Sequence, residues 1–136
     1  MLFVIRRGQS KSATPLPTEA ELAILNILWN TGPSTVREVH NSLSSKQTGY
    51  TTTLKQMQVM AEKGLLARSE RFRAHVYEAR IPKEQTQRLL AGNLLQRAFE
   101  GSAKNLVLGA LSSQKVSAGE LAEIRQMLDE FEKGAR

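Results

Sequence analysis

The sequence contains no cysteine, which excludes disulfide bonds, thiolate metal sites and a cysteine nucleophile. Histidine is almost as scarce, and His40 and His75 are the only two. No serine lies in a Gly-x-Ser-x-Gly frame, and neither a glycine-rich phosphate loop nor a His-Glu-x-x-His motif occurs. Because no nucleophile is paired with a base, we expect the protein not to be an enzyme and to hold no metal or cofactor.

Long hydrophobic runs are also missing, so no segment is expected to cross a membrane. The apolar start, Met1–Ile5, precedes Arg6 and Arg7, which reverses the order found in a secretory signal peptide. Together with the lack of cysteine, this order favours a cytoplasmic protein. Residues 1–17 have no periodicity and are rich in small polar residues and proline, so we expect a flexible arm.

Acidic residues are outnumbered by basic ones, which gives the chain a formal net charge of +6. Residues 1–81 carry 11 Lys and Arg against 6 Asp and Glu, whereas residues 82–136 carry 8 against 7. A basic surface suggests a polyanionic partner such as nucleic acid. A moderate excess of this kind also occurs in proteins that bind no nucleic acid, so the charge alone does not decide the function.

The first helix is expected to begin at Thr18, because Thr18 and Glu21 have the spacing of a capping box. The segment Asn30–Pro33 contains glycine and proline and should end this helix. Its apolar residues recur at helical spacing on one face: Leu22, Leu25, Leu28 and Trp29.

A second, shorter helix is expected from Thr35 to Leu43, with Ser34 as its cap. Its buried stripe should consist of Val36, Val39 and Leu43. His40 falls on the polar side of this helix without a second ligand at metal spacing. This position favours a histidine at the surface.

The segment Tyr50–Gly64 follows a polar loop at residues 44–49 and is expected to form a third helix. Its apolar face carries Leu54, Met57, Met60 and Ala61. The opposite face carries Thr52, Lys55, Gln56 and Val59, a hydrogen-bonding surface that suits the major groove of DNA. The alternative for this segment alone is an ordinary amphipathic helix at the protein surface.

Two short antiparallel strands are expected next, at residues 66–71 and 75–80, joined by residues 72–74. Four cations lie on or beside this hairpin, which makes it a basic wing directly after the third helix: Arg68, Arg71, Arg73 and Arg80. The alternative is a plain basic hairpin that packs on the core through Val76 and Tyr77, and both interpretations can hold on opposite strand faces.

Three further helices are expected in residues 82–136, with Ser117 and Glu120 as a second capping box. About fifty residues seldom bury enough surface to fold alone, so this region is expected to pair with a second copy of the chain. Its proposed dimer contacts are apolar residues at helical spacing: Leu90, Leu94, Leu106, Leu121, Ile124, Leu128 and Phe131.

The fold expected from this order of elements is mainly α. A winged helix-turn-helix domain at residues 18–81 precedes a three-helix dimerisation region at residues 82–136. The sequence itself resembles the penicillinase repressor (BlaI/MecI) family of winged-helix regulators across roughly residues 15–133. The resemblance lies in PTEAELAILNILWNTGPSTVREV, in YTTTLKQMQVMAEKGLL, in RSERFRAHVYEARIP and in GSAKNLVLGAL.

That resemblance implies a homodimeric repressor on a palindromic operator. In the family, a membrane-bound metalloprotease sensor often triggers cleavage at an Asn-Phe bond in the dimerisation region, and the matching residues here are Gly109 and Ala110. Some relatives sense copper through C-terminal cysteines, which this chain lacks. Relatives also commonly have threonine where Lys55 stands and arginine where Val59 stands.

The residues expected to face the major groove are Thr51, Thr52, Lys55, Gln56 and Val59. Contacts to the DNA backbone are expected from Tyr50, Arg68, Arg71 and Arg73. The alternative function is a protein-interaction module whose basic face binds an acidic protein partner, because winged helices perform both tasks.

Overall fold

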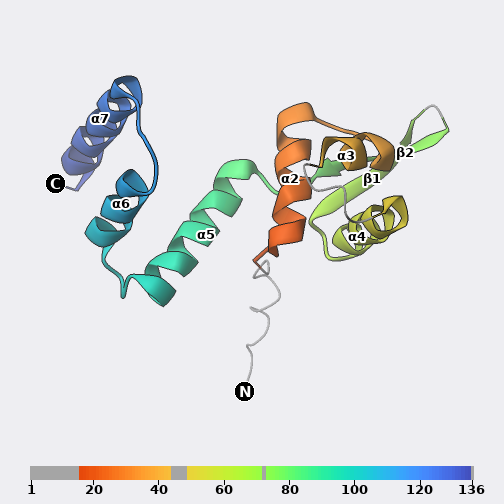
Figure 1. Ribbon diagram of the computed structural model, residues 1–136, viewed down its shortest axis with the longest axis horizontal. Helices are drawn as coiled ribbons and strands as arrows, with labels where there is room; N and C mark the ends of the chain where they lie inside the picture. The colour runs from red at the N-terminus through yellow and green to blue at the C-terminus, as the bar shows by residue number, and fades with distance from the viewer. Residues whose placement is uncertain (1–15, 44–48, 72, 136) are drawn as a thin grey trace, which may run out of the picture. The chain divides into compact units, whose positions relative to one another are not determined.

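A computed structural model describes residues 16–43, 49–71 and 73–135 (Figure 1). These residues form six helices and one two-stranded antiparallel sheet, so the predicted mainly α fold with a β-hairpin wing is confirmed. The elements follow in the order α2 (Glu19–Thr31), α3 (Val36–Ser42), α4 (Tyr50–Glu62), β1 (Leu66–Arg71), β2 (Ala74–Ala79), α5 (Lys83–Ala98), α6 (Ala103–Ser112) and α7 (Ala118–Gly134).

Two sequence predictions fall mostly outside the described residues. Of the predicted arm at residues 1–17, only Leu16 and Pro17 are described. Of the predicted loop at residues 44–49, only Gly49 is described.

The start of α2 has the predicted capping box. Thr18 Oγ1 accepts a hydrogen bond from the Glu21 backbone N–H at 3.2 Å, and Glu21 Oε1 accepts one from the Thr18 N–H at 2.9 Å. Gly32, with φ of 82°, ends the helix, because a left-handed residue is easiest for glycine. The buried apolar residues of α2 are Ile24, Leu25 and Leu28.

The cap of α3 differs from the prediction. Thr35, and not Ser34, caps the helix, because Thr35 and Glu38 have the reciprocal spacing of a capping box and form both of its hydrogen bonds. The Ser34 backbone instead pairs with Tyr77, with N–H to oxygen distances of 2.9 and 2.8 Å. This isolated bridge attaches the turn between α2 and α3 to the wing.

The hairpin is paired in register from Leu66 opposite Ala79 to Arg71 opposite Ala74. Strand β2 therefore begins one residue before the predicted start. Tyr77 is 1% exposed and lies in the core, whereas its neighbour Val76 projects from the other strand face and is only half-buried. Of the two residues predicted to anchor the hairpin, Tyr77 is the one that enters the core.

The hydrophobic core lies within residues 24–81 and joins α2, α3 and α4 to the hairpin. Trp29 packs against this core, and its indole N–H donates to the Ile81 carbonyl at 3.0 Å. The chain divides into two compact units, Met1–Leu90 and Ala91–Arg136, so the division falls inside α5 and not at its start. Within residues 91–135 no side chain is buried.

Candidate nucleic-acid interface

Gly49 is the N-cap of helix α4, and its carbonyl accepts the backbone N–H groups of Thr52 and Thr53 at 3.1 and 3.2 Å. The helix turns Thr53, Met57 and Met60 into the core, where each is at most 3% exposed. The sequence pattern identified the two methionines but not Thr53. A buried threonine is tolerated here because its hydroxyl has a partner, as described below.

The other side of α4 borders a shallow groove of about 470 Å³, called here the α4 groove. All five residues predicted to face the major groove of DNA line it, together with the start of α2 and the end of α4: Thr18, Glu21, Thr51, Thr52, Lys55, Gln56, Val59 and Lys63. Thr51, Thr52 and Lys55 are exposed, whereas Gln56 and Val59 are half-buried. The structure thus brings the predicted reading residues onto one surface.

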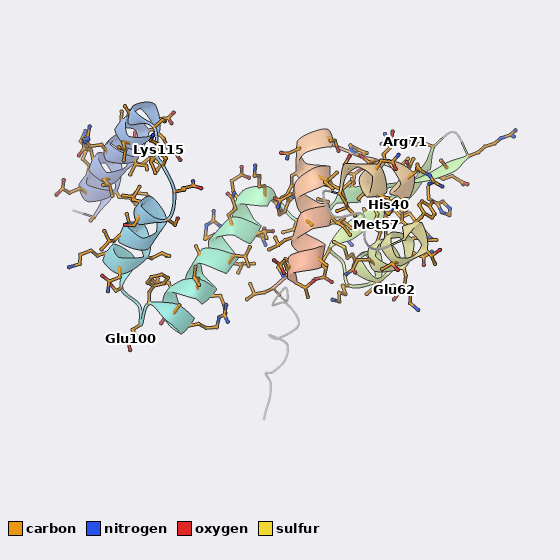
Figure 2. All side chains as sticks on the ribbon, in the orientation of Figure 1. His40, Met57, Glu62, Arg71, Glu100 and Lys115 are labelled. Atoms are coloured by element: carbon orange, nitrogen blue, oxygen red, sulfur yellow. The ribbon has the colours of Figure 1, made fainter. Side chains whose placement is uncertain are left out.

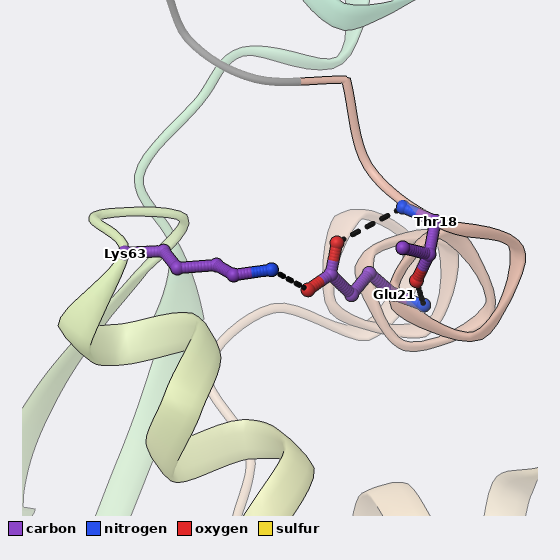
Figure 3. Close-up of polar contacts among 3 residues, drawn as sticks. All are labelled: Thr18, Glu21 and Lys63. Carbon is purple, nitrogen blue, oxygen red and sulfur yellow. Dashed lines mark hydrogen bonds and ion pairs between the residues drawn. The ribbon is translucent and has the colours of Figure 1, made fainter. Parts of the chain in front are cut away.

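One ion pair closes the edge of the α4 groove. Lys63 Nζ lies 2.7 Å from Glu21 Oε2, while Glu21 Oε1 accepts the Thr18 backbone N–H (Figure 3). Burial of Glu21 alone would raise its pKa, but the hydrogen bonds from Lys63 and Thr18 outweigh burial and hold the pKa below its ordinary value. Sequence reasoning did not detect this pair.

Tyr50 does not line the α4 groove. Its ring lies under the Arg37 guanidinium, with 4.2 Å from the Arg37 Cζ to the ring centroid. His40 meets the same ring edge-on, with 6.0 Å between centroids and an angle of 83°. His40, labelled in Figure 2, is half-buried. Its Nδ1 lies 2.9 Å from Thr53 Oγ1, so His40 joins α3 to α4 and is not the surface histidine expected.

The three wing arginines predicted to contact the DNA backbone, Arg68, Arg71 and Arg73, are exposed. Arg68 pairs with Tyr77 and shares its strand face, whereas Arg71, labelled in Figure 2, projects from the opposite face. Arg73 lies in the turn with φ of 65°, a left-handed conformation that is uncommon for a residue with a side chain. The only ion pair recorded among the described residues is Lys63–Glu21, so none of these arginines is neutralised by a carboxylate there.

The C-terminal unit exposes large apolar side chains. Phe131 is 76% exposed and Leu108 is 60% exposed. Of the seven predicted dimer residues, Leu90, Leu106 and Ile124 are half-buried, and the other four are exposed: Leu94, Leu121, Leu128 and Phe131. Val107, Leu108 and Met127 are exposed as well and were not among the predicted contacts. Met127 lies three positions after Ile124, so helical spacing could have identified it.

The predicted cleavage residues, Gly109 and Ala110, are both exposed and lie inside α6. Across residues 16–43, 49–71 and 73–135, no cluster of three or more His, Cys, Asp or Glu side chains could hold a metal ion. Over the same ranges, no helix has the length and apolar character needed to span a membrane.

Comparison with known proteins gives a consistent set of similarities. The family model described as penicillinase repressor matches residues 17–130. The penicillinase repressor of Bacillus licheniformis is 26% identical over 117 residues, which cover 85% of this chain and 91% of that protein. The transcriptional regulator BlaI of Mycobacterium tuberculosis is 32% identical over 120 residues, covering 85% of each.

Among solved structures, the solution structure of the DNA binding domain of the repressor BlaI is 26% identical. It covers 52% of this chain and 88% of that chain, with a TM-score of 0.44.

Proposed function

Since this chain belongs to the penicillinase repressor family of transcriptional repressors, we propose that it binds a palindromic DNA operator as a homodimer. The observation that carries the proposal is the α4 groove, where hydrogen-bonding and methyl-bearing side chains of one helix share a surface. Such a helix can enter the major groove, where each base pair presents a distinct pattern of donors, acceptors and methyl groups. A DNA target also agrees with the expected cytoplasmic location.

The chemistry of the α4 side chains assigns them different bases. The amide of Gln56 can both donate to and accept from adenine, and Lys55 can donate to guanine. The methyl groups of Thr51, Thr52 and Val59 can contact the methyl group of thymine. Repression then follows from occupancy, because a protein bound across a promoter blocks polymerase.

The wing supplies contacts of the other kind. Arg68, Arg71 and Arg73 are exposed cations without a carboxylate partner among the described residues, which is the state needed to bind phosphate. Because Arg68 and Arg71 project from opposite strand faces, the two side chains would reach different phosphates. Such contacts orient the protein on the duplex without reading its sequence.

Dimerisation is supported by the C-terminal unit. Residues 91–135 have no buried side chain, and α7 carries Leu121, Leu128 and Phe131 exposed. Exposed apolar area of this kind mediates association, and a second copy of the same unit offers a self-complementary surface. Two-fold proteins read palindromic sites because each copy contacts one half-site.

Release of the operator by proteolysis is part of the same proposal, with a membrane-bound sensor metalloprotease as the partner. The bond between Gly109 and Ala110 lies inside α6, which extends from Ala103 to Ser112. Proteases cleave helical segments after local opening. Within one copy no residue of α6 is buried, so little packing inside that copy opposes such opening.

The test of this function is selection of bound duplexes from random DNA, followed by titration of the selected duplex and a scrambled one across salt concentrations. A repressor of this type should enrich a palindrome and bind it about 10³-fold or more tightly than scrambled DNA. Equal binding to both duplexes would contradict operator recognition. If no duplex bound at physiological salt, the basic face would be assigned to an acidic protein partner instead.

A further inference from the structure

A stacked cation lies beside the start of the helix that carries the reading residues. The Arg37 guanidinium comes from α3 and covers the ring of Tyr50, the first residue of α4, with 4.2 Å between Cζ and the ring centroid. His40 holds the same ring from its edge, and the buried Thr53 holds His40. A continuous series of contacts therefore runs from the core to an exposed arginine, and we call it the Arg37 stack.

The stack leaves the charge of Arg37 free for a ligand. Arg37 is exposed and has no carboxylate partner among the described residues. The neighbouring acid, Glu38, directs Oε1 to the Thr35 backbone N–H at 2.8 Å as part of the cap of α3. A ring covers only one face of a guanidinium, so the N–H groups at its planar edge can still donate to a pair of oxygens.

We propose that Arg37 binds a phosphate of the DNA backbone beside the α4 groove, and that Tyr50 is the positioning residue for Arg37. This inference rests on the proposed operator binding. In a helix-turn-helix the helix before the recognition helix crosses the backbone, which is the place of α3 in this chain. Stacking restricts the guanidinium before DNA arrives, so less side-chain entropy is lost on binding.

This assignment changes the role of Tyr50. A backbone contact by Tyr50 itself requires its hydroxyl, whereas a platform for Arg37 requires only the ring. Tyr50→Phe keeps the ring and removes the hydroxyl, and Tyr50→Leu removes both. The two substitutions therefore separate the two roles.

The experiment measures binding of the full-length chain to the selected duplex and to a scrambled duplex by fluorescence anisotropy. At about 0.1 M monovalent salt, loss of one phosphate contact should weaken binding roughly eightfold, because affinity varies with salt to a power of about −0.9 per phosphate. Arg37→Ala removes one such contact from each copy of the proposed homodimer, so it should weaken binding to both duplexes roughly sixtyfold. The magnitude of the slope of log K against log salt should fall by about 1.8. Lys115→Ala, which removes an exposed cation between α6 and α7, is the control and should change neither.

The Tyr50 variants complete the test. Tyr50→Leu should weaken both complexes roughly two- to fivefold for each copy of the proposed homodimer, because the Arg37 side chain must then be ordered when DNA binds. Tyr50→Phe should bind as the unchanged chain does. In the Arg37→Ala background, Tyr50→Leu should have no further effect, because Tyr50 acts through Arg37.

Three results would overturn the inference while leaving operator binding intact: full affinity in Arg37→Ala, equal losses in Tyr50→Phe and Tyr50→Leu, or additive losses in the double variant. Failure of the unchanged chain to bind either duplex would instead overturn the proposed function. Circular dichroism melting accompanies each variant. If Tyr50→Leu does not fold, the Arg37→Ala and Tyr50→Phe variants still test the inference. Arg37→Ala changes an exposed residue, and Tyr50→Phe keeps the ring.

Discussion

Lys63 Nζ lies 2.7 Å from Glu21 Oε2, so an ion pair ties the end of α4 to the first turn of α2. Both oxygens of Glu21 are engaged, because Oε1 accepts the Thr18 N–H at 2.9 Å. Glu21 is 3% exposed and Lys63 is 42% exposed, so the carboxylate depends on this pair more than the ammonium does. The pair helps fix the orientation of the helix that carries the proposed reading residues.

Glu21→Gln should destabilise the chain at pH 7. Glutamine can retain the capping box but not the charge that attracts Lys63. Because solvent screens Lys63, we expect a loss of about 1–2 kcal/mol in the free energy of unfolding. Urea denaturation measures it, and Glu19→Gln, an exposed acid in the same helical turn, is the control that should change little.

The same variant tests the direction of the pKa shift. The pKa of Glu21 is lowered in the folded chain, against about 4.3 for an unfolded glutamate. The ionised Glu21 should therefore contribute fully to the free energy of unfolding well above a pH of about 4.3, and this contribution should disappear as pH falls through the folded pKa. The difference in stability between the unchanged chain and Glu21→Gln should shrink below about pH 4. A difference that grows on acidification would contradict the lowered pKa.

Lys55→Ala should weaken binding of the selected operator by roughly 1–3 kcal/mol for each half-site if Lys55 contacts a base. The loss should then be larger on the operator than on scrambled DNA, because a base contact is sequence-specific. Gln58→Ala, an exposed change on the same helix outside the α4 groove, is the control. Equal losses on both DNAs would reduce Lys55 to a phosphate contact, and no loss would remove it from the interface.

Arg73→Gly isolates the charge at the tip of the wing. Arg73 has φ of 65°, and glycine adopts this conformation without a steric penalty, so the turn should persist. Binding to operator and scrambled duplexes should weaken equally, and the magnitude of the salt slope should fall by about 1.8 if Arg73 of each copy contacts one phosphate. A change of sequence preference would show instead that Arg73 reads a base.

Local patterns in the sequence predicted most of the fold. The capping box of Thr18 and Glu21, the apolar periodicity of α4 and the alternating hairpin each depend on residues a few positions apart. Such signals place helix starts, buried faces and strands, as the confirmed elements show. Where two local signals competed, as at Ser34 and Thr35, the reciprocal pair with Glu38 decided the cap, and Ser34 was left to pair with Tyr77.

Contacts between distant residues could not be predicted in this way. Glu21 and Lys63 are 42 positions apart, and Trp29 and Ile81 are 52 apart, so no periodicity relates them. The Arg37 stack required the relative placement of α3 and α4, which the sequence leaves open. The five predicted reading residues of α4 do share the α4 groove, because one helix face is a local property. Whether they contact DNA as assigned stays a prediction.

Leu128→Asp should convert the proposed dimer to monomers. Leu128 is 57% exposed on α7, where Phe131 is exposed as well, and a second copy would cover both side chains. Because the interface is two-fold, the substitution buries two carboxylates, each at a cost of several kcal/mol, so dimerisation should weaken by at least roughly 3 kcal/mol. Sedimentation velocity measures the oligomeric state directly.

Gln126→Asp is the matched control for Leu128→Asp, because Gln126 is exposed and lies two positions before Leu128, on the opposite side of α7. It should leave the dimer intact. Operator affinity should follow the oligomeric state, because a monomer contacts only one half-site while its α4 groove is unchanged. An intact Leu128→Asp dimer would exclude this face of α7 as the interface. A monomeric variant with full operator affinity would exclude the dimer as the form that binds DNA.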